Sequence, residues 1–228
     1  VFAGADTVVN GWQVGLLRGF GRSSFAVDEH ASSATSSNYH VGGYAGTSFG
    51  ALTLRSGAGY TLSTVETTRN VTVPDTQELT AAYNAGPAQV FTEVGYRLET
   101  ETMTLEPFAG LALSDLSTDA YAETGGAAAL AADASRTDIA YSTLGLRASS
   151  SVDLGGAPSL LTGMVGWRHA AGDTSSTATH GFAGSQAFTV GGLPVAQDAF
   201  LLQLGLGVTL GASSSLDLSY DGEFAVDN

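Results

Sequence analysis

Residues 46–50 carry the first pattern that could do chemistry. The run Gly46-Thr47-Ser48-Phe49-Gly50 matches G-x-S-x-G, the motif that presents a nucleophilic serine in α/β-hydrolases. The motif requires a sharp turn from a strand into a helix. Here it runs into a two-residue hairpin link and another strand-like segment. Ser48 is therefore not predicted to be a nucleophile.

The histidines and glycines offer no better site. His169 and Asp173 are four residues apart, which in a strand separates them by roughly 13 Å, too far for a direct hydrogen bond. The four histidines, at positions 30, 40, 169 and 180, show no metal-ligand spacing, and there is no Cys. Gly205, Gly207 and Gly211 lack the following helix that a dinucleotide fingerprint needs. No catalytic residue, metal or cofactor is expected.

The composition indicates a membrane protein that crosses with strands. Only 13% of the 228 residues are charged, against about 25% in soluble proteins, and the mean hydropathy is +0.13. No segment reaches the roughly 20 consecutive apolar residues of a transmembrane helix. The net charge of −14 argues against a nucleic-acid partner, because phosphates require a basic surface.

Apolar residues recur at every second position in several segments. From 200 to 210 every even position is apolar, whereas positions 203, 205, 207 and 209 are Gln, Gly, Gly and Thr. The same alternation occupies residues 88–98, 140–154 and 216–226. A period of two is typical of strands with one apolar and one polar face.

The links between strand-like runs alternate between short and long. Ten runs lie near residues 1–9, 12–28, 37–49, 52–68, 80–100, 103–118, 138–154, 159–173, 197–210 and 214–226. Short links fall at 10–11, 50–51, 101–102, 155–158 and 211–213, and long links at 29–36, 69–79, 119–137 and 174–196. This alternation predicts an all-β, antiparallel up-and-down transmembrane β-barrel with tight periplasmic turns and long extracellular loops. A Greek-key sandwich would not alternate so regularly.

Turn residues and aromatic residues agree with a barrel. Asn10-Gly11 is a strong signal for a type I′ hairpin turn. Aromatic residues near strand ends are expected in the interfacial girdles of the membrane: Trp12, Tyr39, Phe49, Tyr96, Tyr220 and Phe224. Lumen-facing glycines would leave space inside the barrel, although a glycine in a strand can also mark a bulge.

Six segments resemble a known family. They are GADTVVNGWQVGLL, YHVGGYAGTSFGAL, AQVFTEVGYR, LEPFAGLALS, STLGLRAS and GMVGWRHAAGD. In order and spacing, over nearly the whole chain, they resemble the C-terminal autotransporter β-domain of type V secretion. The resemblance implies a twelve-stranded barrel in the bacterial outer membrane, often threaded by a helix, that exports an N-terminal passenger. The partners it implies are outer-membrane lipid, the passenger, the barrel assembly machinery and periplasmic chaperones, with the chain itself a monomer.

The chain departs from the family pattern at its ends. Family members finish in a strand with a terminal aromatic residue, whereas this chain stops at Asp227-Asn228. The strand directions place both ends of the ten-strand set at the extracellular rim, so one further strand at each end gives twelve. Residues 1–228 are therefore expected to be a single barrel domain that lacks the first and last strands, the lumen helix and the passenger.

The alternation places nine charged residues on the lumen face. They are Arg55, Glu93, Arg97, Glu106, Arg147, Arg168, Asp217, Asp221 and Glu223. Such a lining would hydrate a passing polypeptide without holding it tightly. The same charges could instead pair and brace the barrel, and the two roles can coexist.

Three functions fit these observations. A translocator is favoured by the resemblance together with the barrel pattern. A small outer-membrane porin is the alternative, although ten to twelve strands make a narrower barrel than the roughly 16–18 strands of open porins. A membrane-embedded hydrolase comes third.

Arg18 breaks the outward pattern of the second strand. The outward positions include Val14, Leu16, Arg18 and Phe20, and an arginine at the bilayer midplane costs about 2–4 kcal/mol. A bulge after Leu17 could turn Arg18 inward, its guanidinium could snorkel to the headgroups, or this surface could meet protein. Snorkelling is favoured, because the outward phase continues through Phe20.

Overall fold

The structure, a computed structural model, describes residues 1–27, 32–72, 75–211 and 214–226. His30, the two residues after Gly211 and the final Asp227-Asn228 lie outside the described residues. Ten strands form one antiparallel sheet in the order β1 (Phe2–Val9), β2 (Trp12–Val27), β3 (Ser32–Phe49), β4 (Leu52–Thr72), β5 (Thr76–Tyr96), β7 (Thr104–Thr118), β10 (Ser135–Leu154), β11 (Ala157–Gly172), β14 (Asp198–Gly211) and β15 (Ser214–Ala225). The short β6 (Leu98–Glu99) pairs with β7. In these ranges, no helix is long and apolar enough to cross a bilayer.

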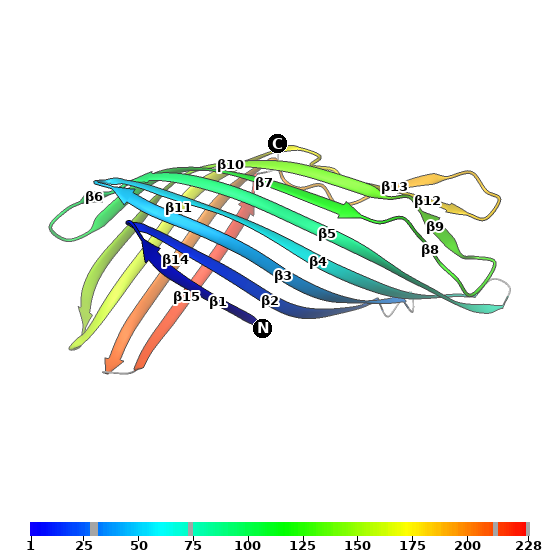
Figure 1. The fold of residues 1–228 in the computed structure, drawn as a ribbon, viewed down its shortest axis with the longest axis horizontal. Helices are drawn as coiled ribbons and strands as arrows, with labels where there is room; N and C mark the ends of the chain where they lie inside the picture. Colours follow the sequence, from blue (N-terminus) through cyan, green and yellow to red (C-terminus); the bar gives the residue numbers. More distant parts are fainter. Residues whose placement is uncertain (28–31, 73–74, 212–213, 227–228) are drawn as a thin grey trace.

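The ten strands curl into a half-barrel in which sequence neighbours are spatial neighbours (Figure 1). Each of the ten predicted strand-like runs corresponds to one strand of this sheet. The all-β, antiparallel up-and-down prediction is confirmed. Among the described residues, β1 pairs only with β2 and β15 only with β14.

One end of the sheet is made of tight turns, and we call it the turn end. Asn10 and Gly11 have φ of 51° and 82°, the left-handed pair of values that a type I′ turn requires. Gly50 has a φ of 61°, and Gly155 and Gly156 have φ of 69° and 91°. These positions tolerate positive φ because they are Gly or Asn.

The opposite, loop end differs from the prediction. Residues 32–36 belong to β3, and β4 and β5 pair as far as Thr72 and Thr76. The predictions of loops at 29–36 and 69–79 are therefore wrong for residues 32–36, 69–72 and 76–79, which form strands. The extensions are rich in Ser and Thr. Thr favours strands, yet these extensions contain few apolar residues, so no apolar alternation marked them as strands.

The predicted loops at 119–137 and 174–196 contain a second, four-stranded sheet. Its order is β13 (Phe188–Gly191), β12 (Thr177–Phe182), β9 (Leu130–Ala132) and β8 (Tyr121–Ala122). We call it the loop sheet; it lies beyond the loop end of the half-barrel, at the right of Figure 1. These loops are therefore folded rather than irregular.

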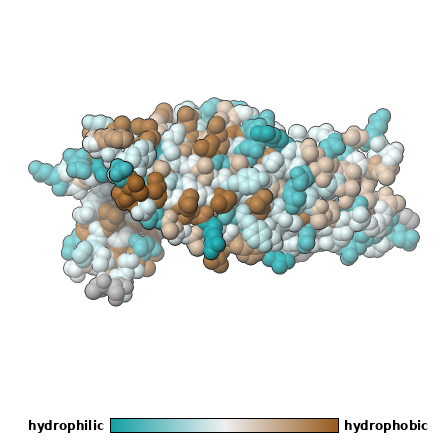
Figure 2. Space-filling view, in the orientation of Figure 1, coloured by the Kyte–Doolittle hydropathy of each residue, from teal (hydrophilic) through white to brown (hydrophobic). Residues whose placement is uncertain are grey.

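The convex face of the half-barrel is apolar. Leu16, Leu113 and Leu218 are 74%, 57% and 58% exposed, and Figure 2 shows hydrophobic side chains gathered on the left of one face, with paler and more hydrophilic residues toward the loop end. An apolar surface of this extent requires a partner. Aromatic residues border it: Trp12 packs edge-on against Phe49 at the turn end, with ring centroids 6.4 Å apart.

A second aromatic row borders the apolar face nearer the loop end. Phe20 packs against Tyr39 at 5.1 Å and Phe200 against Phe224 at 6.4 Å between ring centroids. The eight residue steps from Trp12 to Phe20 span about 26 Å along a strand. With the strand tilt of about 35–45° this segment rises about 20 Å, which is most of an apolar band about 25 Å tall.

The concave face is built from aromatic rings that lie over glycines. A Cβ added to Gly15 would meet the Tyr44 ring at 2.3 Å, and one added to Gly145 would meet the Phe108 ring at 2.5 Å. Phe91 covers Gly57 in the same way. The inward glycines therefore provide room for rings from the neighbouring strand. This arrangement is close packing rather than bulge formation, since the registers at these pairs run without a shift.

Candidate functional site

Four charged side chains from four strands meet on the concave face near the turn end. Arg55 of β4 stands opposite Glu93 of β5, and Glu106 of β7 stands opposite Arg147 of β10. Arg55 Nη1 lies 2.8 Å from Glu93 Oε1 and 2.7 Å from Glu106 Oε1. Arg147 lies 2.6 Å from Glu93 and 3.2 Å from Glu106. We call these residues the turn-end cluster, in which each arginine contacts both carboxylates.

The turn-end cluster is partly shielded from solvent. The Glu106 and Glu93 side chains are 8% and 15% exposed, whereas Arg55 is 42% exposed. Arg147 also places its guanidinium carbon 3.8 Å from the centre of the Phe108 ring, a favourable cation–π geometry. Carboxylates removed from water need such paired donors, so the cluster holds four strands in one arrangement.

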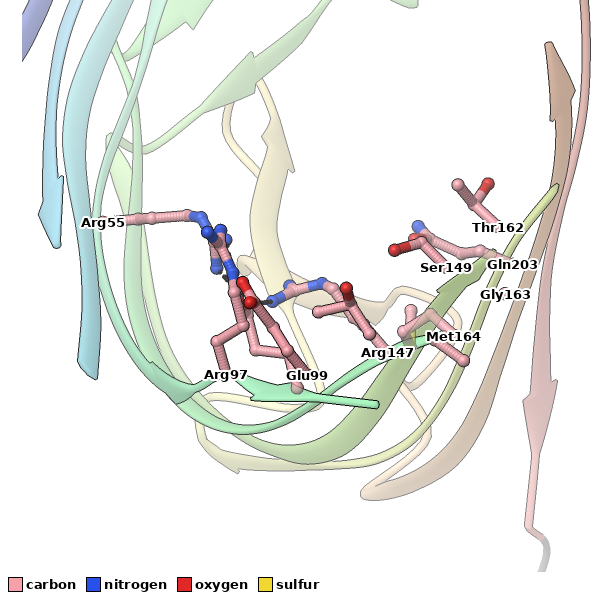
Figure 3. Close-up of a pocket in the computed structure, with 12 residues that line it drawn as sticks. Arg55, Arg97, Glu99, Arg147, Ser149, Thr162, Gly163, Met164 and Gln203 are labelled. Carbon is pink, nitrogen blue, oxygen red and sulfur yellow. Dashed lines mark hydrogen bonds and ion pairs between the residues drawn. The ribbon is translucent and has the colours of Figure 1, made fainter. Parts of the chain in front are cut away.

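A cavity of about 350 Å³ opens beside the turn-end cluster. In Figure 3, the side chains of Arg55, Arg97 and Arg147 converge on the same space, and Ser149, Thr162 and Gln203 line the opposite side. Arg97 lines this cavity, and within the described residues it takes part in no ion pair. The cavity is therefore lined by the Arg97 guanidinium, the Glu99 carboxylate and several neutral polar groups, besides the turn-end cluster.

A second ionic contact lies on the concave face near the loop end. Arg168 of β11 reaches across β14 and pairs with Glu223 of β15. The Arg168 guanidinium carbon also lies 4.8 Å from the centre of the Tyr141 ring. Ionic contacts thus occur near both ends of the concave face.

Asp217 and Asp221 face the same concave side of β15. Asp217 stands opposite Gly207 and Asp221 opposite Gln203, and within the described chain neither is ion-paired. All nine predicted lumen residues therefore lie on the concave face. Four form the turn-end cluster, two form the Arg168–Glu223 pair, and three are separate.

Other concave-face contacts were not predicted from the sequence. The Tyr44 hydroxyl donates to Asp6 at 2.9 Å, and His40 lies 2.8 Å from the Thr61 hydroxyl while it stacks on Phe2. The alternation in residues 1–9 and 37–49 could have assigned these side chains to one face. No sequence pattern indicates which of them touch.

The hydrolase candidates do not assemble. Ser48 lies in the β3–β4 hairpin, opposite Thr53, and four strands of the sheet separate β3 from β11, which carries His169. His169 Nδ1 lies 3.0 Å from Asp198, which also accepts a hydrogen bond from Trp167 Nε1. Within the described residues, no group of three or more His, Asp or Glu side chains could hold a metal ion.

The family follows from comparison with known proteins. A family model described as "Autotransporter beta-domain" matches residues 1–221. The chain belongs to this family. The autotransporter β-domain is 35% identical over 228 residues to an extracellular serine protease of Serratia marcescens and 34% identical over 215 residues to a second one. The two matches cover 99% and 93% of this chain, but only 22% and 20% of the relatives' own length.

Two solved structures share the fold. The translocator domain of the autotransporter NalP from Neisseria meningitidis has a TM-score of 0.71 at 18% identity, covering 97% of this chain and 73% of that chain. The β-domain of the Bordetella autotransporter BrkA has a TM-score of 0.59 at 21% identity, covering 99% of this chain and 84% of that chain. The autotransporter β-domain is an outer-membrane β-barrel of Gram-negative bacteria, and its convex apolar face is the lipid-facing surface.

Part of the autotransporter β-domain rises well beyond the membrane. Arg69 lies 17 residues past Leu52, the first residue of β4, whereas crossing the bilayer takes about 9–11 strand residues. There Arg69 binds Glu123 through two hydrogen bonds of 3.0 and 2.5 Å and donates to the Ala128 carbonyl at 2.9 Å. Burial raises the pKa of the Glu123 carboxyl, but hydrogen bonds from Arg69 and the Leu130 amide outweigh it, so its pKa lies below the ordinary value.

Proposed function

We propose that this chain is the outer-membrane translocator domain through which an N-terminal passenger reaches the cell surface. The observation that carries the proposal is the concave face: a polar, charged wall inside a barrel of the autotransporter family, running from the turn-end cluster to Arg168 and Glu223.

Because the lumen charges pair with one another, the lumen favours the passage of a polypeptide over its retention. Each carboxylate of the turn-end cluster already contacts two guanidiniums, so a passing peptide gains little by displacing them. Arg97, Asp217 and Asp221 stay available as isolated charges that keep water in the lumen. Bracing the barrel and hydrating the path are therefore compatible roles of one set of residues.

In the part of the chain that the structure describes, β1 and β15 each have one unpaired edge, which supports a larger barrel. An open edge inside a membrane leaves backbone groups without partners, which only closure resolves. We propose that one further strand beside each edge completes a twelve-stranded barrel, and that a helix of the passenger side occupies the lumen. The barrel assembly machinery and periplasmic chaperones are the proposed partners in assembly, and the closed barrel acts as a monomer.

A protease is the first passenger to test. Both curated relatives are named extracellular serine proteases, and this chain spans about a fifth of their length. Proteolytic activity would then belong to the passenger, while the barrel performs the export.

The test is surface display of a passenger by the complete reading frame that contains this chain. An epitope placed in the segment upstream of Val1 should be reached by antibody on intact cells. The control is the same segment expressed without residues 1–228, which should stay inside the outer membrane. An epitope that stays hidden, together with ion-conducting pores in planar bilayers, would support the porin instead.

A further inference from the structure

Two arginines of β2 stand apart from the other six. Five of these six form ion pairs: Arg55, Arg147 and Arg168 with lumen carboxylates, Arg69 with Glu123, and Arg136 with Asp115 and Asp138. The sixth, Arg97, lines the lumen cavity. Arg18 and Arg22 are both exposed. Within the described part of the chain, neither forms an ion pair.

Both arginines lie on the lipid-facing surface. The register of β2 with β3 runs without a shift from Gln13 to Val27, so the predicted possibility of a bulge that turns Arg18 inward is wrong. Arg18 and Arg22 share the outward phase of Leu16 and Phe20. They follow each other on one face of one strand, with Cα atoms about 13 Å apart.

The loop-end aromatic row lies between them. Phe20 and Tyr39 belong to that row. Arg18 lies two residues from Phe20 toward the turn end, and Arg22 lies two residues from Phe20 toward the loop end. Aromatic rows mark the boundary between hydrocarbon and headgroups. The loop end of an outer-membrane barrel faces the cell exterior, so the two guanidiniums bracket the headgroup level of the outer leaflet.

No carboxylate of the described outer face neutralises this pair. Arg18 stands between Ala3 and Val41, and Arg22 stands opposite Ser37. The outward carboxylate nearest by register is Glu66, two strands away on β4 and opposite Thr35 of β3. Two strand spacings amount to about 10 Å, and among the described residues Glu66 forms no ion pair with either arginine.

We propose that Arg18 and Arg22 bind the phosphate groups of a lipid in the outer leaflet. Guanidinium is the side-chain group best suited to phosphate, because its N–H groups match the oxygens in a bidentate fork. With a net charge of −14, the protein as a whole repels an anionic lipid surface, so a local basic pair gives such lipids a defined contact. The Ser37 hydroxyl adds a further donor beside Arg22.

The test measures lipid binding by the full-length protein, purified in an alkyl maltoside, a detergent without phosphate. Diphosphorylated lipid A in mixed micelles should raise the thermal unfolding midpoint of the barrel. The same lipid without its phosphates, and inorganic phosphate at equal concentration, should not. High salt should weaken the effect. Passenger export plays no part in this measurement. A failure of the lipid-binding proposal can therefore be distinguished from a failure of the translocator proposal.

The variant Arg18→Gln/Arg22→Gln should weaken lipid A binding by about tenfold or more, because two charge-assisted contacts are lost. Arg18→Lys/Arg22→Lys keeps the charges without the fork and should lie between this variant and the wild type. Arg136→Gln is the matched control: it removes one outward arginine that is already paired with Asp115 and Asp138. It should bind lipid A like the wild type.

Three results would overturn the proposal: wild-type affinity in the Gln variant, equal binding of dephosphorylated lipid A, or equal binding of inorganic phosphate. A dimer that dissociates in the Gln variant would assign the arginines to a protein contact instead. If the Gln variant does not fold, the proposal is still tested by comparing how the wild type and the Lys variant bind lipid A, dephosphorylated lipid A and inorganic phosphate.

Discussion

At the scale of single residues, the concave face depends on side chains that fill space left by glycine and on charges that satisfy one another. Both features are costly to disturb. A close-packed ring cannot yield to a new methyl group, and a shielded carboxylate that loses a donor remains without its partner.

Gly145→Ala should destabilise the barrel by about 1–3 kcal/mol, as overpacking typically does. The new Cβ would lie 2.5 Å from the Phe108 ring and 2.8 Å from the Val165 carbonyl oxygen. The measurement is the urea midpoint of the complete barrel folded in lipid. Gly163→Ala is the control, since its Cβ would meet nothing nearer than 3.9 Å. Equal midpoints for the two variants would show that Phe108 can move away from its neighbour.

Glu106→Gln should lower stability by about 1–3 kcal/mol, because a charge-assisted contact to Arg55 and another to Arg147 weaken at a shielded site. The same urea titration measures it. Arg97→Gln serves as the control, because Arg97 lines the same cavity without an ion pair among the described residues. A loss as large for Arg97→Gln as for Glu106→Gln would contradict a bracing role of the cluster.

At the scale of elements, the strands of β4 and β5 continue past the membrane and support the loop sheet. Leu79 is fully buried there, Tyr83 stacks on Tyr121 with ring centroids 4.3 Å apart, and Thr80 pairs with Thr124. The Arg69–Glu123 contact closes this junction. The loop sheet is therefore anchored to the barrel rather than free.

The junction should loosen in acid. Because the pKa of Glu123 is lowered from its ordinary value of 4.5, the ionised carboxylate stabilises the folded form. This contribution is fully present above about pH 5 and is lost as the pH falls through the lowered pKa. Protection of the Leu130 amide from hydrogen exchange, relative to its intrinsic rate, should fall over that range, because this amide donates to Glu123 at 2.9 Å. In Glu123→Gln this protection should be low at every pH. Wild-type protection no greater than that of Glu123→Gln in the range where the carboxylate is ionised would contradict this prediction.

At the scale of the whole molecule, the tight turns and the long loops lie at opposite ends of one curled sheet (Figure 1). This separation assigns each end to one side of the membrane. The apolar convex face between the aromatic rows spans the bilayer.

Single cysteines report this orientation, because the chain has no native Cys. A membrane-impermeant thiol reagent on intact cells should label cysteines placed at residues 119–137 or 174–196. It should not label cysteines at Asn10-Gly11 or Gly50-Ala51, which only permeabilised cells would expose. The reverse pattern would invert the barrel and place the loop sheet in the periplasm.

The sequence by itself determined the features that depend on neighbouring residues. Alternation at a period of two assigned the faces of β14 and β15, and Asn10-Gly11 marked its own turn. Side chains at positions i and i+2 share a face whatever the strand pairs with. For that reason the number of strands and the lumen phase of residues such as Arg55 were predictable.

Only the tertiary structure decided which lumen residues touch and where the strands end. Arg55 and Glu93 are 38 residues apart and Arg147 and Glu93 are 54 apart, and the register of intervening strands, which no local pattern encodes, brings them together. The extensions of β4 and β5 carry too few apolar residues to show an alternation, and their strand form follows from backbone pairing between them. The outward position of Arg18 was likewise decided by an unbroken register on both sides of β2, because pairing, not residue type, excludes a bulge.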